Sequence, residues 1–72
     1  MKISYYPDTD SLYIDLSAQP SVESREVSEG IVLDYDAEGQ LVGIDIDNAS
    51  KKVNLKTLTL NRIPADRQIF AV

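Results

Sequence analysis

Apolar and polar residues alternate along the first part of the chain, and this period of two predicts β-strands. Residues 2–6 and 11–17 alternate in this way, with one apolar face each. Between them, Pro7-Asp8-Thr9-Asp10 has the chemistry of a turn, because proline presets φ near about −65° and aspartate side chains bond nearby backbone N–H groups. The chain is therefore predicted to begin with a β-hairpin.

Three further strands are predicted in the next part of the chain. Residues 22–28 are mostly polar, as expected for an exposed edge strand, whereas residues 31–35 and 41–47 are rich in large apolar and β-branched residues. The segments 28–30 and 36–39 each place a glycine where a tight turn needs one. Strands joined in consecutive hairpins predict a five-stranded antiparallel β-meander.

One face of this sheet is predicted to be apolar, since alternate residues of a strand point to the same side. The residues that share it are Ile3, Tyr5, Leu12, Ile14, Leu16, Ile31, Leu33, Val42, Ile44 and Ile46. Burial of each large apolar side chain stabilises a fold by roughly 1.5–3 kcal/mol. We therefore expect the face to be covered, either by the rest of the chain or by a second copy.

The alternation of apolar and polar residues with a period of two ends after residue 47. Asp47 or Asn48 can cap a helix, and the sequence predicts one over residues 49–57. The alternative is a short helical turn followed by a strand, because Leu58 and Leu60 alternate with threonines.

Taken together, these elements predict a single α+β domain over residues 1–72. Residues 1–47 form the antiparallel sheet, and residues 48–72 form a C-terminal helix and tail packed on one face of it.

Composition narrows how so short a chain can be stabilised. A domain of this size buries only about 60% of the surface of its unfolded chain, and those below about 80 residues often need a disulfide, a metal or a second subunit. The 72 residues include no cysteine and no histidine, so disulfides are excluded and a structural zinc site lacks its ligands. Self-association as a homodimer is therefore one expected route to stability.

The sequence also predicts a cytoplasmic location. No apolar run reaches the length of about 20 residues that a membrane helix requires. Acidic residues stand near the N-terminus, where a signal peptide would be apolar. No membrane partner is expected.

Charge is unevenly distributed along the chain. Residues 1–47 hold eleven of the twelve acidic residues and two basic ones, whereas residues 48–72 hold five basic residues and one acidic one. An acidic surface favours a basic protein partner. The basic tail lacks interleaved aromatic residues, so no direct binding of nucleic acid is expected, and a solvated face explains its charge equally well.

The segment from Asp34 to Asp45 resembles a calcium-binding loop in its spacing of acidic residues, with Gly39 at the sixth position. It departs from that pattern at Glu38, and Asp45 stands where the loop needs a bidentate glutamate. Both flanks are predicted to be strands, which favours a hairpin turn. The alternative function that this segment suggests is a small-ligand or divalent-cation binding domain that uses the acidic hairpin.

No catalytic residue, cofactor or metal site is predicted. Acidic residues recur in pairs, but the solvent-facing side of an antiparallel sheet needs polar residues in any case. Without histidine and cysteine, the usual nucleophile–base arrangements cannot form. We therefore expect a non-enzymatic protein-interaction or structural module.

Two segments resemble the bacterial domain-of-unknown-function family 2283. They are the apolar-tyrosine run Ile3–Ile14 with its Asp10, and the Asp-Tyr-Asp-x-x-Gly hairpin with the Val-Gly-Ile strand in Gly30–Ile46. The resemblance implies no substrate or catalytic residue. Because genes of such proteins are often taken to lie beside those of small basic ribonuclease-like toxins, it suggests an antitoxin-like role. The tail would then be a wrapping arm, with Leu58, Leu60, Ile63 and Phe70 as the predicted partner-binding residues.

Overall fold

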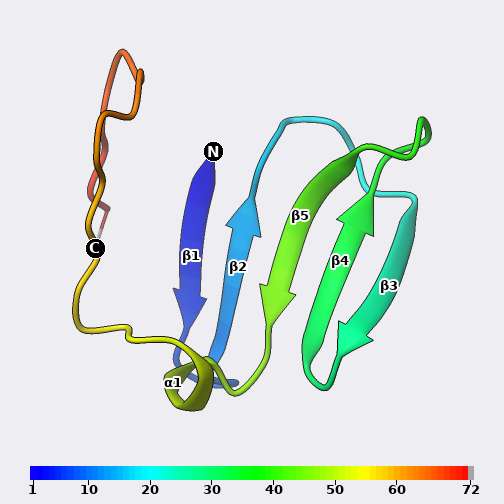
Figure 1. Cartoon of the computed structure of the whole chain (residues 1–72), viewed down its shortest axis with the longest axis horizontal. Coiled ribbons are helices and arrows are strands. Elements are labelled where there is room, and N and C mark those ends of the chain that lie inside the picture. The colour runs from blue at the N-terminus through cyan, green and yellow to red at the C-terminus, as the bar shows by residue number, and fades with distance from the viewer. Residues whose placement is uncertain (72) are drawn as a thin grey trace.

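The computed structural model describes residues 1–71 and contains five strands and one short helix (Figure 1). The elements are β1 (Lys2–Tyr6), β2 (Ser11–Asp15), β3 (Glu23–Ser28), β4 (Ile31–Tyr35), β5 (Leu41–Ile46) and α1 (Ala49–Lys52). All five predicted strands are confirmed, with boundaries that differ by at most two residues. The fold is a single antiparallel sheet followed by a helical turn and an extended tail.

The strands do not form the predicted meander, because their order in the sheet is β1-β2-β5-β4-β3. The connection after β2 crosses to the far edge, and β5 then returns between β2 and β4 (Figure 1). The physical reason lies in burial: β5 contains the buried pair Val42 and Gly43, whereas every residue of β3 is exposed. The apolar strand therefore takes the centre and the polar strand takes an edge, which chain order alone does not reveal.

The predicted apolar face is confirmed by the register of the ladder. Ile14 pairs with Ile3 on one side and with Ile44 on the other, and Ile44 in turn pairs with Leu33. These residues form one continuous row across four strands. We call this side of the sheet the apolar face; the other side, which we call the polar face, carries Ser4, Tyr13, Asp15, Ser24, Asp34 and Asp45 among others.

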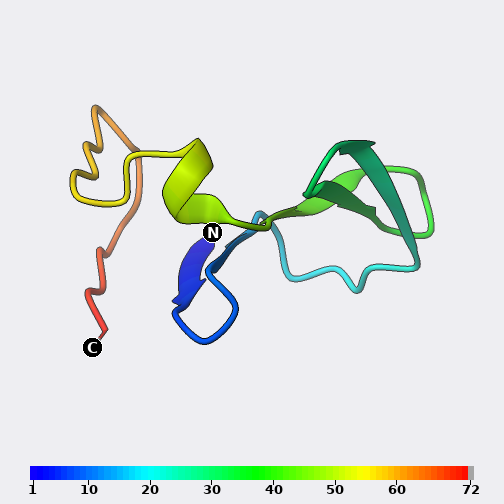
Figure 2. The same ribbon diagram turned by 90° about the horizontal axis from the view of Figure 1, so that it is seen from below.

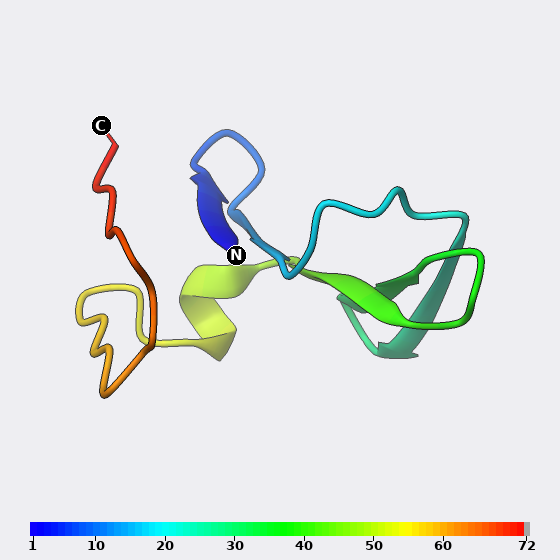
Figure 3. The ribbon, with the colours of Figure 1, turned by 90° about the horizontal axis from the view of Figure 1, so that it is seen from above.

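The predicted cover of the apolar face is wrong. The helix ends at Lys52 instead of residue 57, because Val53 is extended and no apolar stripe of helical spacing follows it. Every residue from 54 to 71 is exposed, and the tail lies beyond β1 and not over the sheet (Figures 1 and 2). Figure 3 shows the same separation from the opposite side. Among residues 1–71, Val42 and Ala49 are the only buried side chains, at 4% and 0% exposure.

None of the helices within residues 1–71 is long and apolar enough to cross a membrane.

Candidate interaction surfaces

A hydrogen-bonded network crosses the polar face and joins three strands. Tyr13 on β2 donates its hydroxyl proton to Asp34 Oδ2 on β4, with 2.7 Å between the oxygens, and Ser24 on β3 donates to Asp34 Oδ1 at 2.6 Å. Asp34 is therefore an acceptor for two hydroxyl groups that reach it from opposite sides. Because hydrogen bonds to a charged acceptor are stronger than neutral ones, this network ties the edge strand β3 to the centre of the sheet.

Gly43 makes the Tyr13–Asp34 bond possible, since Tyr13 must cross β5 to reach β4. In the ladder, Gly43 pairs with Asp34 on one side and with Asp15 on the other. A Cβ atom at this position would lie 2.7 Å from Tyr13 Cζ, well inside van der Waals contact. The absence of a side chain at Gly43 thus leaves the space in which the tyrosine ring lies.

This network shifts the ionisation of Tyr13. The hydrogen bond to the Asp34 carboxylate, followed by burial and by the nearby negative charges, raises the pKa of Tyr13 from 10.0 to about 12. The ionised phenolate is disfavoured because it would lose the bond and face a like charge. The network therefore stabilises the fold fully below pH 10, and this contribution is lost as the pH rises towards about 12.

We expect Tyr13 to ionise late in an alkaline titration. In an alkaline titration followed by tyrosinate absorbance, the last step is expected near pH 12 and is assigned to Tyr13. Replacement of Asp34 by asparagine removes the like charge and is expected to move this step back towards 10. The Tyr13→Phe variant is the control, because the late step is expected to vanish from it. The absence of a tyrosinate step near pH 12 in the wild-type chain would contradict the network.

Asp45 lies on the same face, where its surroundings disfavour the charged carboxylate. Burial, followed by a hydrogen bond to Asp47 and repulsion from Asp47 and Asp34, raises the pKa of the Asp45 carboxyl above its ordinary value. The acidic residues of β4 and β5 therefore repel one another, so the polar face concentrates negative charge at the centre of the sheet.

Asp10 joins the first hairpin to the start of α1. Its side chain accepts a hydrogen bond from the Tyr5 hydroxyl at 2.7 Å and from both the backbone N–H and the hydroxyl of Ser50, at 3.1 and 2.6 Å. Its carbonyl accepts from the N–H of Ala49 at 2.8 Å. Asp10 adopts a left-handed φ of 53°, which aspartate tolerates better than most residues. The predicted caps do not act as side-chain caps: Asn48 makes no such bond, and Asp10 satisfies the first helical N–H groups instead.

We expect Asp10 to stabilise the fold at neutral pH and to lose this effect in acid. Hydrogen bonds from Ser50 and Tyr5 lower the pKa of the Asp10 carboxyl from 3.8. A lowered pKa in the folded state means that the contribution is complete above pH 3.8 and disappears as the pH falls through the lower, folded-state value. The melting temperature of Asp10→Asn is therefore expected to lie below that of the wild type at pH 7 and to converge with it in acid. A constant difference at all pH values would argue that the charge of Asp10 has no role.

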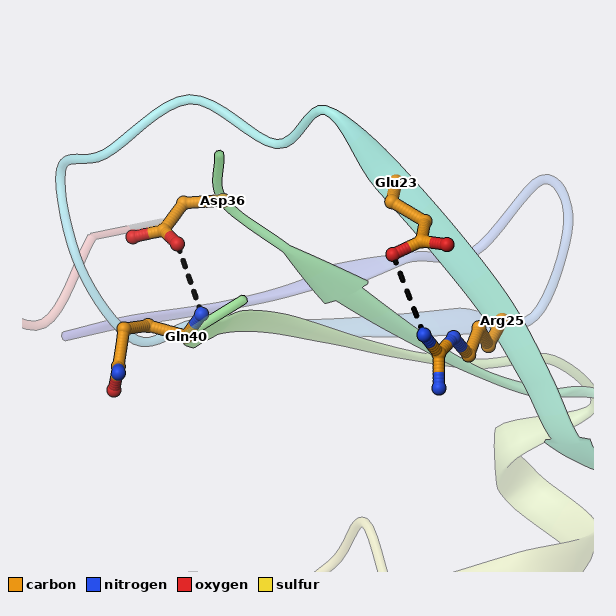
Figure 4. A network of polar contacts seen from close by, with 4 residues as sticks. All are labelled: Glu23, Arg25, Asp36 and Gln40. Carbon is orange, nitrogen blue, oxygen red and sulfur yellow. Dashed lines mark hydrogen bonds and ion pairs between the residues drawn. The ribbon is translucent and has the colours of Figure 1, made fainter. Parts of the chain in front are cut away.

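The acidic hairpin from Asp34 to Asp45 does not gather its carboxylates. Asp36 Oδ1 accepts hydrogen bonds from the backbone N–H groups of Glu38 and Gln40, both at 2.9 Å, and so closes its own turn. Figure 4 shows the bond from Gln40. Asp34 is engaged by Tyr13 and Ser24 on the polar face. Within residues 1–71, no three acidic side chains are grouped so that they could hold a metal ion. The segment is a β-hairpin, as its flanking strands indicate.

The edge strand β3 carries its own charged contacts. Arg25 and Glu23 form an ion pair at 3.5 Å (Figure 4), and the Arg25 guanidinium lies over the ring of Tyr35 at 5.4 Å from its centre. Both charged side chains are well exposed, so the ion pair adds little stability. The exposed side chains of Arg25 and Glu23 make this edge of the sheet charged and accessible to solvent.

The structure brings the four predicted partner-binding residues together beside β1. Leu58, Leu60, Ile63 and Phe70 are all exposed, and together with the side chains of β1 they line a groove of about 850 Å³. We call this the β1–tail groove. Ile3 and Tyr5 form its other wall. The sequence predicted these tail residues as a partner-binding set, but it did not indicate that they face the edge of the sheet.

A second depression, of about 260 Å³, lies between the turn at Asp36 and the segment that precedes β3. Gln19, Pro20, Ala37 and Glu38 are among its lining residues. Its walls are exposed turns, and they contain no cluster of groups that would fix a ligand.

The fold and these surfaces define a small acidic domain built on an open antiparallel sheet, with one apolar face uncovered. Residues 2–50 match the model of a protein family described as a protein of unknown function, DUF2283, so the chain belongs to this family. The match spans the whole sheet and ends at the start of α1, and the tail lies outside it. No curated protein and no solved structure matches the chain.

Proposed function

We propose that this chain is a non-enzymatic protein-binding module that docks a protein through its apolar face and the β1–tail groove. The observation that carries the proposal is the incomplete burial of the apolar face: within residues 1–71 Val42 is its one buried side chain, whereas in the row that crosses four strands Ile3 is exposed and Ile14, Leu33 and Ile44 are half-buried. An exposed apolar surface of this kind is typical of a site of protein association.

Charge favours a basic partner. The sheet region, residues 1–47, carries eleven acidic residues and two basic ones. This excess of negative charge attracts a basic protein to the domain, and complementary charge would raise the association rate. An antitoxin-like role, in which the module covers the basic active surface of a small ribonuclease-like toxin, is the specific form of the proposal.

The test is a direct binding measurement with a small basic ribonuclease-like protein as the probe. By calorimetry, Leu58→Asp is expected to weaken binding by a factor of about 10 or more, since a charge replaces an apolar contact in the groove. Val22→Asp is the matched control, because Val22 is 64% exposed and Leu58 is 65% exposed, but Val22 lies outside the groove. Equal losses in the two variants, or no binding by the wild type, would overturn the proposal.

A further inference from the structure

The two edges of the sheet differ in how they are protected. β3 carries three charged residues, Glu23, Arg25 and Glu26, and a register shift interrupts its ladder. Charged side chains and bulges of this kind prevent an edge from pairing with another strand. β1 carries Lys2 as its one charged residue and pairs with β2 without interruption over its full length. The outer edge of β1 is therefore open to pairing.

Ile3 and Tyr5 hold the free backbone groups of this edge. In an antiparallel ladder, the backbone groups of successive residues point to alternate sides of a strand. Leu16, which follows β2, donates its N–H to the backbone of β5 at 2.8 Å, so the groups of Tyr13 face β1, where its ladder partner is Ser4. The groups of Ser4 thus point inward to β2, and those of Ile3 and Tyr5 point outward.

The tail flanks this edge without pairing to it. It runs beside β1 (Figures 1 and 2), and within residues 1–71 no backbone hydrogen bond joins the two. The tail forms the second wall of the β1–tail groove, opposite Ile3 and Tyr5, and the groove encloses about 850 Å³. Because this wall excludes a second sheet from the edge of β1, the occupant of the groove has to be a single segment of chain.

The side chains that line the groove are apolar and basic. Ile3 and Tyr5 are each 43% exposed, and the four tail residues predicted to bind a partner line the other wall. Lys2 and Arg67 are the charged residues of the lining, which contains no acidic residue. Within residues 1–71, neither of them is in an ion pair. The groove is thus a positively charged site on a domain whose net charge is −5.

We propose that the protein partner inserts a single extended segment into the β1–tail groove, where the segment adds to β1 as a sixth strand of the sheet. This inference rests on the proposed function, because it takes the groove as the docking surface of that same partner and names the part of the partner that enters it. Backbone hydrogen bonds to Ile3 and Tyr5 supply affinity, and apolar side chains at alternate positions of the segment pack against the two walls. The segment carries a carboxylate that faces Lys2 and Arg67.

Charge complementarity gives the segment its acidic group. A basic side chain in the groove would be repelled by Lys2 and Arg67, whereas a carboxylate is attracted by both. The partner is therefore basic over the surface that meets the acidic sheet and acidic in the segment that enters the groove. Opposite charges at two separate places fix the orientation in which the two proteins dock.

Hydrogen exchange measured by NMR on the full chain tests the added strand. The probes are the small basic ribonuclease-like protein and a blocked peptide of alternating valine and threonine that ends in glutamate. In the free chain, the amides of Ile3 and Tyr5 are expected to exchange freely, whereas that of Ser4 is protected by β2. Each probe is expected to slow exchange at Ile3 and Tyr5 by a factor of about 10 or more and to leave Ser4 unchanged.

Reversal of a charge in the groove tests the acidic group of the segment. Arg67→Glu is expected to weaken binding of the glutamate peptide by a factor of about 10 and to strengthen binding of the same peptide ending in lysine. Arg62→Glu is the matched control, because it makes the same change of charge in the tail at a residue that does not line the groove. Equal losses in the two variants would overturn the carboxylate contact.

The outcomes separate this inference from the proposed function. Leu58-dependent binding of the basic protein without protection of Ile3 and Tyr5 would overturn the added strand and leave the proposed function standing. Protection by the peptide, with no binding of the basic protein, would overturn the proposed function and leave the strand-binding edge. Amides of Ile3 and Tyr5 that are already protected in the free chain would overturn the inference, because the chain itself would then occupy the edge.

Discussion

Replacement of Gly43 by alanine is expected to lower the free energy of unfolding by about 1–3 kcal/mol. The added methyl group would overlap the phenol ring of Tyr13, which lies directly over Gly43. Tyr13 would have to turn away, and its hydrogen bond to Asp34 would be lost. For a domain of this size, each kcal/mol corresponds to about 4–8 °C in the melting temperature, so thermal unfolding followed by circular dichroism measures the effect readily.

The control for this prediction is the same substitution in a chain that lacks the tyrosine ring. In a Tyr13→Ala background, the two closest contacts of Gly43→Ala are gone, and the next is Asp34 Oδ2, at an ordinary contact distance of 3.4 Å. Alanine is also favoured over glycine in a strand by about 0.5–1 kcal/mol. The cost of Gly43→Ala is therefore expected to vanish or change sign in that background. An unchanged cost would mean that Gly43 is required for a reason other than the passage of Tyr13.

Replacement of Ile44 by alanine is expected to lower the free energy of unfolding of the isolated chain by about 2 kcal/mol. Ile44 stands at the centre of the apolar face, with Ile14 and Leu33 as its ladder partners on either side. Removal of a fully enclosed isoleucine costs about 2–5 kcal/mol. Ile44 is only partly buried, so the lower end of this range applies. Urea unfolding, analysed for a change in midpoint at constant slope, provides the measurement.

Val27→Ala is the matched control, because Val27 lies on the exposed edge strand β3 and is 56% exposed. It is expected to change the free energy of unfolding by no more than about 0.5 kcal/mol. A loss of 4–5 kcal/mol at Ile44 would contradict the open face, since a cost of that size requires dense packing on all sides.

The strands could be predicted from the local pattern, because alternation of apolar and polar residues and the turn residues between strands involve only positions that are close in sequence. Alternation at residues 2–6 and 11–15 predicted the first hairpin, and the glycines at 30 and 39 marked two of the turns, both with positive φ. The order of the strands in the sheet could not be predicted from local pattern. The position of β5 between β2 and β4 depends on burial across the whole sheet, whereas the meander assumed that neighbours in sequence are neighbours in space.

Contacts between distant segments account for what the sequence did not predict at the surfaces. Asp10 had the features of a turn residue, but its bonds to Ser50 join residues 40 positions apart, and no local pattern indicates them. The role of Gly43 likewise depends on Tyr13 and Asp34, which reach it from two other strands. The cover of the apolar face was predicted because burial of its large apolar side chains would stabilise the fold. The tail of the same chain does not provide this burial, because residues 54–71 are all exposed.

The most direct test of the open apolar face is the exposure of its methyl groups to a soluble paramagnetic agent, measured by methyl NMR on the isolated chain. The signals of the half-buried Ile14, Leu33 and Ile44 are expected to broaden substantially, while those of the buried Val42 and Ala49 stay sharp. On addition of a protein that docks on this face, the three signals are expected to become protected. Signals of Ile14, Leu33 and Ile44 as sharp as that of Val42 in the isolated, monomeric chain would contradict the account, because the face would then be covered from within.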